Sequence, residues 1–242
     1  MSTLFLSDLH LSPLRPEITA LFESFMAGPA RAAERVLILG DLFDYWAGDD
    51  DLDDTFNRRI VATMRACAGS VPLFFIRGNR DFLVGSEFSA ASGAALLDDP
   101  YVMDLYGVRT LIMHGDSLCT DDLEYQRFRN EVRAQVWIGN FLARPIAARK
   151  THIESLRIRS ESEKRVKAMA IMDVNPEAVK SAMRAHHCSR LIHGHTHRPA
   201  VHRFDLDGLP AERWVLADWY QDGSYLICKK GGLGSQRVPP GP

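Results

Sequence analysis

Residues 3–10 read TLFLSDLH, a short apolar run that ends in the motif Asp8-Leu9-His10. The run has the length and composition of a buried strand, and the polar motif follows it directly. Asp and His are side chains that bind hard or borderline divalent metals. The same arrangement recurs after other apolar runs along the chain. The further motifs are Gly40-Asp41, Gly78-Asn79-Arg80-Asp81, His114-Gly115-Asp116 and Gly194-His195-Thr196-His197.

Strand-like and helix-like segments alternate in the first part of the chain. Strands are expected at Thr3–Ser7, Arg35–Leu39, Leu73–Ile76, Thr110–Met113 and Arg190–Ile192. Helices are expected at Glu17–Met26 and Thr55–Cys67. This alternation predicts an α/β fold. Because open α/β sheets bind ligands at the carboxyl ends of their strands, we expect the five motifs to converge at one edge.

The C-terminal part has a different pattern. Val201–Leu206, Arg213–Ala217 and Ser224–Cys228 alternate or run apolar with turns between them, and we expect antiparallel strands that complete a second sheet. The tail Gly231–Pro242 is rich in Gly and Pro, and we expect it to fray.

The stretch 122–182 separates the fourth motif from the fifth and has no strand signal. Its apolar residues recur at helical spacing, and Pro145 and Asn175-Pro176 punctuate it. We therefore expect residues 1–121 and 183–242 to form one core, and residues 122–182 to form a helical insertion cap over the active site.

Bulk properties exclude several classes. A formal net charge of −2 over 242 residues is not that of a nucleic-acid polycation, so no nucleic-acid partner is expected. The N-terminus lacks the basic and apolar regions of a signal peptide, and no apolar run is long enough to span a membrane. The four cysteines are scattered and fit free thiols in a reducing cytosol.

The motif residues suit two adjacent metal ions. Asp8 and His10 are two positions apart, as are His195 and His197, so an extended backbone points each pair the same way. Asp41 follows its strand alone and has two oxygens with which to bridge two ions. Two ions about 3.5–4 Å apart acidify a shared water and clamp a displacement at phosphorus. The alternative is that these are ordinary polar residues of strand-to-loop turns.

The five motifs resemble those of the calcineurin-like metallophosphoesterases, and the likeness spans the chain apart from the insertion. The resemblance implies two facing mixed β-sheets flanked by helices, with a pair of divalent ions such as Mn, Fe or Zn. Oxygen and imidazole ligands without thiolate favour Mn²⁺. By resemblance, Asp8, His10, Asp41 and His197 hold one ion, whereas Asp41, Asn79, His114 and His195 hold the other. Asn79, Arg80 and His195 are then the expected catalytic residues, which also contact substrate.

Arg80 departs from the family pattern, which usually has Gly-Asn-His-Asp. That His is a candidate acid for the leaving group, and arginine cannot replace it because its pKa lies above about 12. Arginine can hold phosphate oxygens and stabilise developing charge. The substitution therefore favours a leaving group that departs as a stable anion, as in pyrophosphate cleavage. The alternative is that Arg80 only pairs with Asp81.

The insertion is locally basic. Its basic residues are Arg144, Arg149, Lys150, Arg157, Arg159, Lys164, Arg165 and Lys167, against Glu154, Glu161 and Glu163. Apolar residues such as Phe141 and Met172 lie beside them, which suits an amphiphile with a phosphate head, or contact with a membrane surface. The alternative is a helical hairpin that packs its apolar face on the core and keeps solvated Lys and Arg side chains outside. The acidic stretch Asp49–Asp54 is expected to be solvated.

Several stretches together resemble a narrower branch of the family. They are residues 40–46, Arg80, residues 171–175 and residues 193–199. The branch cleaves a UDP-linked diacylated glucosamine to UMP and the diacylglucosamine 1-phosphate in lipid A synthesis, in the cytoplasm on the inner membrane's cytoplasmic face. By that resemblance, the head-group site comprises Asp122, Tyr125, Arg157, Ser160, Lys164 and Lys167.

Two other functions remain open from the sequence. One is a metallophosphoesterase acting on another phosphodiester or a phosphoprotein. The other is a non-catalytic interaction module on a degenerate fold, which the intact ligand set disfavours. A monomer with peripheral contact to the inner membrane is the expected assembly.

Overall fold

The computed structural model describes the backbone of residues 1–164 and 173–239. Within these ranges it describes every side chain except those of residues 159–164. The strands are β1 Thr3–Leu6, β2 Arg35–Ile38, β3 Leu73–Ile76, β4 Ala94–Leu97, β5 Tyr101–Leu105, β6 Val108–Ile112, β7 Arg190–His193, β8 Ala200–Leu206, β9 Leu209–Val215, β10 Ser224–Lys229 and β11 Gly232–Arg237. The helices are α1 Pro16–Ala27, α2 Thr55–Ala68, α3 Ser86–Ser92, α4 Leu123–Val132, α5 Gln135–Leu142, α6 Ile146–Lys164 and α7 Pro176–Ala185.

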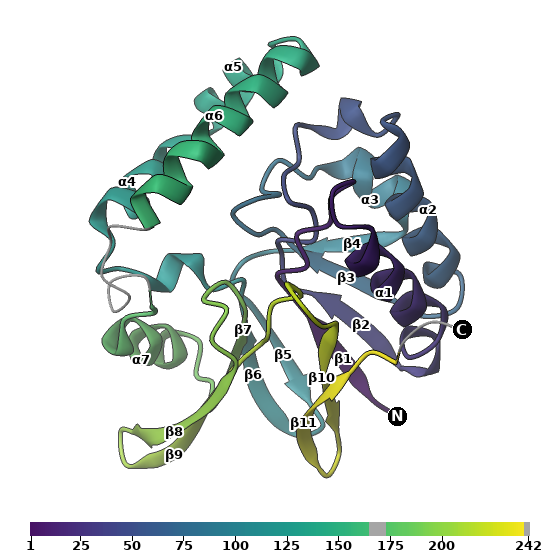
Figure 1. The fold of residues 1–242 in the computed structure, drawn as a ribbon. Coiled ribbons are helices and arrows are strands. Elements are labelled where there is room, and N and C mark those ends of the chain that lie inside the picture. Colours follow the sequence, from purple (N-terminus) through teal and green to yellow (C-terminus); the bar gives the residue numbers. More distant parts are fainter. Residues whose placement is uncertain (165–172, 240–242) are drawn as a thin grey trace.

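Two mixed β-sheets face each other, as the family resemblance predicted (Figure 1). The first has the strand order β11-β10-β1-β2-β3-β4, with β1 to β4 parallel. The second has the order β5-β6-β7-β9-β8, in which β6, β7 and β9 run parallel. Because the strands before the motifs run parallel within each sheet, their carboxyl ends meet at one edge.

Three apolar layers hold the sheets and helices together. Between the sheets, Phe5 and Ile76 of the first meet Ile112 and Ile192 of the second, all fully buried. Helices α1, α2 and α3 cover the outer face of the first sheet (Figure 1). On the outer face of the second sheet, α7 packs Met183 into a third cluster. The predicted helices and early strands agree with the structure within a residue or two.

Two C-terminal predictions were wrong. Ser224–Cys228 was expected in the second sheet, but β10 joins the first, antiparallel to β1, with Thr3 opposite Cys228. The tail was expected to fray, but its residues 232–237 form β11 and a full antiparallel ladder with β10, whereas residues 240–242 lie outside the described residues. An alternating pattern does not encode which sheet receives a strand, and backbone hydrogen bonds to β10 form whatever the side chains are.

The prediction that Asp49–Asp54 is solvated was wrong for part of the stretch: Asp51 is buried, whereas the Asp53 side chain is 98% exposed, as predicted. Asp49 accepts hydrogen bonds from three backbone N–H groups at the start of α3, those of Gly85, Glu87 and Phe88. Asp54 caps the N-terminus of α2 through the N–H groups of residues 56 and 57. The acidic loop therefore fixes the ends of two helices.

The same loop also binds the insertion. Arg149 of α6 is 1% exposed and forms an ion pair with Asp50, and it donates a 2.6 Å hydrogen bond to the Ala47 carbonyl. Lys150 lies 2.9 Å from Asp51 and 3.2 Å from Asp54. These two cations were counted among the basic groups available to a ligand or a membrane, but here they are neutralised at the base of α6.

Helices α4, α5 and α6 form an arm that stands away from the sheets (Figure 1). Asp122 caps α4 by accepting a hydrogen bond from the Tyr125 N–H. In the part of the chain that the structure describes, no helix combines the length and apolarity that crossing a membrane requires.

Candidate metal centre

The backbone adopts a left-handed conformation at most of the predicted ligands. Asp8, His10, Asp41, His195 and His197 all have φ between 48° and 69°, in the left-handed region. That conformation is uncommon for residues other than glycine, and each case costs about 1–3 kcal/mol. Asp, Asn and His tolerate it better than most residues do. Concentrated at strand ends, this strain indicates a functional constraint that the surrounding fold enforces.

Two glycines let the loops approach the ligands closely. A Cβ on Gly78 would overlap Oδ1 of Asp41, and a Cβ on Gly194 would overlap Oδ2 of Asp8. Any larger residue at either position would displace a carboxylate. The glycines of Gly-Asn and Gly-His are therefore required by the packing of one motif against another.

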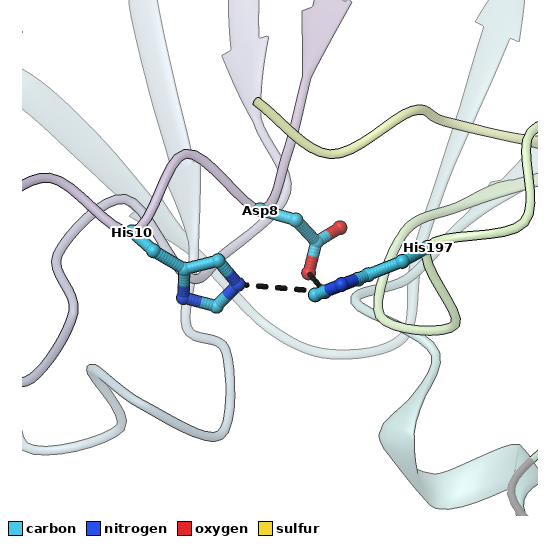
Figure 2. A group of neighbouring side chains, drawn as sticks. All are labelled: Asp8, His10 and His197. Atoms are coloured by element: carbon cyan, nitrogen blue, oxygen red, sulfur yellow. Dashed lines mark hydrogen bonds and ion pairs between the residues drawn. The ribbon is translucent and has the colours of Figure 1, made fainter. Parts of the chain in front are cut away.

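Asp8, His10 and His197 point toward one another (Figure 2). Nε2 of His197 lies 3.3 Å from Oδ1 of Asp8 and 3.4 Å from Nε2 of His10. The Asp8 carboxylate is fully buried, and its Oδ1 accepts no hydrogen bond from any residue that the structure describes. A buried carboxylate oxygen facing two imidazole nitrogens is costly unless a proton or a metal cation lies between them.

Asp41 lies between this group and a second one. Its Oδ2 is 3.9 Å from Nε2 of His10, whereas its Oδ1 is 3.7 Å from Nε2 of His114. Oδ1 of Asn79 lies 2.9 Å from Nε2 of His114 and 2.8 Å from Nδ1 of His195. The structure thus brings all seven predicted ligands together, with one carboxylate facing both groups, and the donor set fits two divalent cations.

The electrostatics of these side chains also favour bound cations. Burial, together with the charges of Asp81 and Asp8, raises the pKa of Asp41 above its usual range. Burial opposes protonation of His114, but Asp41, Asp8 and Asp116 outweigh it and raise its pKa to about 9. Burial, with the His114 charge, lowers the pKa of His195 to about 3. The positive charge of protonated His114 offsets the negative charge of the buried carboxylates. Bound divalent cations would take over this role and displace the proton.

Other residues hold the ligands in place. Asp81 accepts hydrogen bonds from the N–H groups of Gly78, Asp41 and Leu42, so its carboxylate ties two motif loops together. The Nδ1–H of His114 donates a 2.8 Å hydrogen bond to the Leu39 carbonyl, which turns Nε2 toward Asp41.

Asp116, the last residue of its motif, is a structural anchor. It is fully buried and pairs with Arg129 of α4 at 2.8 Å and with Arg133 at 3.0 Å. The Tyr125 hydroxyl also donates to it, at 3.1 Å. The arm is therefore fixed to the fourth motif at its first helix.

The predicted substrate residues have diverse surroundings. The Tyr125 ring stacks on His195, with centroids 5.9 Å apart. The charge of Arg80 lies close enough to His10 to help lower the pKa of that imidazole, after the larger effect of burial. Arg157 pairs with Asp44 of the core at 2.6 Å. The side chains of Ser160 and Lys164, and the whole of Lys167, lie outside the described residues.

Sequence reasoning missed one segment of the site. Residues 218–220 lie between β9 and β10, and the Trp219 N–H donates to the Asp8 carbonyl. The Tyr220 ring stacks on His10, with centroids 5.6 Å apart. Residues 218–220 do not directly follow β9 and contain no Gly-Asp or Gly-His motif. Their place in the site therefore becomes visible only in the folded structure.

The sequence pattern of the calcineurin-like phosphoesterases matches residues 1–199, which is most of the chain. The chain therefore belongs to the calcineurin-like phosphoesterase family, as its motifs predicted.

Its similarity to individual members is close and nearly full-length. It is 50% identical over 226 residues to the UDP-2,3-diacylglucosamine hydrolase of Aromatoleum aromaticum, covering 93% of this chain and 92% of that one. The enzyme of the same name from Aeromonas hydrophila is 47% identical, with 96% of each chain covered. Among solved structures, an archaeal phosphodiesterase aligns with a TM-score of 0.48 and 12% identity, over 98% of this chain and 100% of that one.

Proposed function

We propose that this chain hydrolyses the pyrophosphate bond of UDP-2,3-diacylglucosamine, giving UMP and 2,3-diacylglucosamine 1-phosphate for lipid A biosynthesis. One observation carries the proposal: relatives that bear this enzyme's name are 47–50% identical to the chain over at least nine-tenths of both lengths. The intact ligand set supports it, because seven potential ligands converge on one site and five of them adopt a strained backbone there.

Two divalent ions complete the proposed site, one held by Asp8, His10, Asp41 and His197, the other by Asp41, Asn79, His114 and His195. When bound, such a pair acidifies a water molecule and neutralises charge on phosphate oxygens. Mn²⁺ is the proposed metal because carboxylate, amide and imidazole ligands without thiolate suit it. The chain's own contribution is to hold these ligands rigidly before substrate arrives.

In this proposal, Arg80 explains why the enzyme cleaves a pyrophosphate bond and not an ester whose leaving group needs a proton. Its backbone N–H donates to Oδ1 of Asp41 at 2.8 Å, so the residue is fixed to the bridging carboxylate. Its guanidinium can bind the transferred phosphoryl group and stabilise charge that develops there. No proton need be supplied, because the leaving phosphate departs as a stable anion.

The arm is the proposed acyl-sugar site. Tyr125 of α4 stacks on His195, and Asp122 caps the same helix. Arg157 lies on α6, and Ser160, Lys164 and Lys167 follow it in the sequence. Arg157 pairs with Asp44 at 2.6 Å. A phosphate or sugar oxygen would compete with that carboxylate for the guanidinium. Peripheral attachment to the cytoplasmic face of the inner membrane and a monomeric state belong to the same proposal.

A paired assay tests the substrate class. Wild type and Lys167→Ala are compared on the diacyl nucleotide and on bis-p-nitrophenyl phosphate, with Lys180→Ala of α7 as the matched control. Lys180 pairs with Glu177 at the surface, at 3.0 Å. We expect Lys167→Ala to lower kcat/KM for the lipid substrate alone, and Lys180→Ala to change neither reaction.

The same assay includes UDP-N-acetylglucosamine, which lacks long acyl chains. Each buried methylene contributes about 0.8 kcal/mol, so its kcat/KM should be lower by several powers of ten. Equal turnover of the two nucleotides would contradict the lipid substrate and favour a phosphodiesterase of another specificity.

A further inference from the structure

The segment 218–220 contains a carboxylate whose position the known motifs do not explain. Asp218 has two different partners. Its Oδ1 accepts a 3.1 Å hydrogen bond from the Tyr220 N–H, which closes a local turn. Its Oδ2 lies 3.6 Å from Nδ1 of His197. The side chain is 23% exposed, so the carboxylate stands at the rim of the site and not in bulk solvent.

The two nitrogens of His197 therefore face different groups. Nε2 faces Asp8 and His10, at 3.3 and 3.4 Å, where the proposed ion lies. Nδ1 faces Asp218 on the opposite side of the ring. A carboxylate opposite Nδ1 favours the tautomer that carries its proton there, which leaves the Nε2 lone pair available to a metal.

The segment is fixed to the same loops that hold the ligands. The Trp219 N–H donates to the Asp8 carbonyl, and Arg15 anchors Tyr220 through a cation–π contact at 4.9 Å. Arg15 itself donates to the Leu9 and Trp219 carbonyls. These contacts fix the position of Asp218 next to His197, and none of them involves His197.

We propose that Asp218 is a positioning residue for the metal centre: it fixes the tautomer and orientation of His197 and so raises the affinity of the ion that His197 binds. The proposal rests on the two-metal site of the proposed function. It assigns a role to the connection between β9 and β10, which contains none of the five motifs.

Asp218→Asn is the informative variant. The amide oxygen can still accept from the Tyr220 N–H, so the turn is retained. The amide N–H₂ now faces His197 and favours the opposite tautomer, with the proton on Nε2, where it blocks coordination. Asp222→Asn is the matched control, because Asp222 lies in the same connection but pairs with Arg237 at 3.5 Å, well exposed.

Two readouts on purified full-length protein test the role. In the metal-free protein at mildly alkaline pH, ¹⁵N NMR of the histidine rings should show the Nδ1–H tautomer for His197 in wild type and its loss in Asp218→Asn. In calorimetric Mn²⁺ titration, Kd should rise about 10–100-fold for one ion and stay unchanged for the other. Asp222→Asn should match wild type in both experiments.

An unchanged tautomer in Asp218→Asn, or unchanged Mn²⁺ affinity at both sites, would overturn the proposal. Equal weakening of both ions with a lower Tm would also overturn it, since that result reports a general structural role. A protein that shows both expected changes but cleaves no UDP-linked lipid contradicts the proposed function and supports the role of Asp218.

Discussion

The metal centre and the helical arm are held in opposite ways. The ligands are fixed by backbone contacts from several strand ends at once, and Asp8 and His114 are fully buried. The arm meets the core through ion pairs, chiefly those of Asp116 near its start and Arg149 near the base of α6, and through apolar packing of Phe141 and its neighbours. One face of the arm is apolar and packs on the core, where Phe141 is 2% exposed, whereas other apolar side chains such as Val136 at 77% and Ile158 at 65% face outward. Chemistry needs preorganised groups, whereas recognition of a long flexible ligand tolerates an adaptable surface.

Asp41→Ala should have the largest effect of these variants, because it removes the carboxylate at the middle of the metal centre. One carboxylate faces both ligand groups, so its loss should remove both ions and lower kcat by about 10³-fold or more, since metal catalysis contributes several kcal/mol. Metal analysis and steady-state kinetics measure the two effects together. Full activity after exhaustive chelation of the wild type would refute a metal requirement altogether.

Arg80→Ala separates phosphate stabilisation from metal binding. We expect kcat to fall by about 10²–10³-fold while both ions still bind, because a donor aimed at developing charge acts mainly in the transition state. Arg80→His, the family's usual residue, should not restore pyrophosphate cleavage. Wild-type turnover in either variant would mean that Arg80 serves only as a local ion pair.

Arg149→Ala tests the attachment of the arm. The variant removes a buried guanidinium that bonds Asp50 and the Ala47 carbonyl, and we expect a loss of about 2 kcal/mol in unfolding free energy. Hydrogen exchange should rise in α6 more than in the strands. The control is Arg144→Ala, an exposed arginine before α6, which should change stability by less than about 0.5 kcal/mol. Equal effects of the two variants would show that Arg149 does not anchor the arm.

Asp99→Asn should have the smallest effect, on the pH dependence of stability. Burial, together with the Asp116 charge, raises the pKa of Asp99 to about 6, and neither of its oxygens has a hydrogen-bond partner among the described residues. The folded protein therefore binds this proton more tightly than the unfolded chain, so its ionisation costs stability that returns as pH falls from about 6 toward 4. Asp99→Asn should raise the unfolding free energy by about 1 kcal/mol at neutral pH and by less near pH 4. A constant difference across that range would contradict the assignment.

The metal centre and the arm also differ in how far local sequence patterns predict them. The predicted metal ligands follow apolar strands within short motifs, so their convergence could be predicted from local patterns and the rule for parallel strand ends. The partners of Arg149 and Lys150 lie about a hundred positions away in the acidic loop, and no local pattern links them. Asp218 and the sheet assignment of β10 were missed for the same reason: both depend on which segments the completed fold places side by side.

The central claim is that a two-metal centre directs water to a pyrophosphate, with Arg80 in place of a general acid. Phosphorus NMR of the products formed from UDP-2,3-diacylglucosamine in oxygen-18 water, with Mn²⁺ present, tests it most directly. We predict UMP and 2,3-diacylglucosamine 1-phosphate as the only products, with the oxygen-18 shift on one of the two phosphates. Formation of UDP with the free sugar, or no cleavage by the metal-loaded protein, would contradict it.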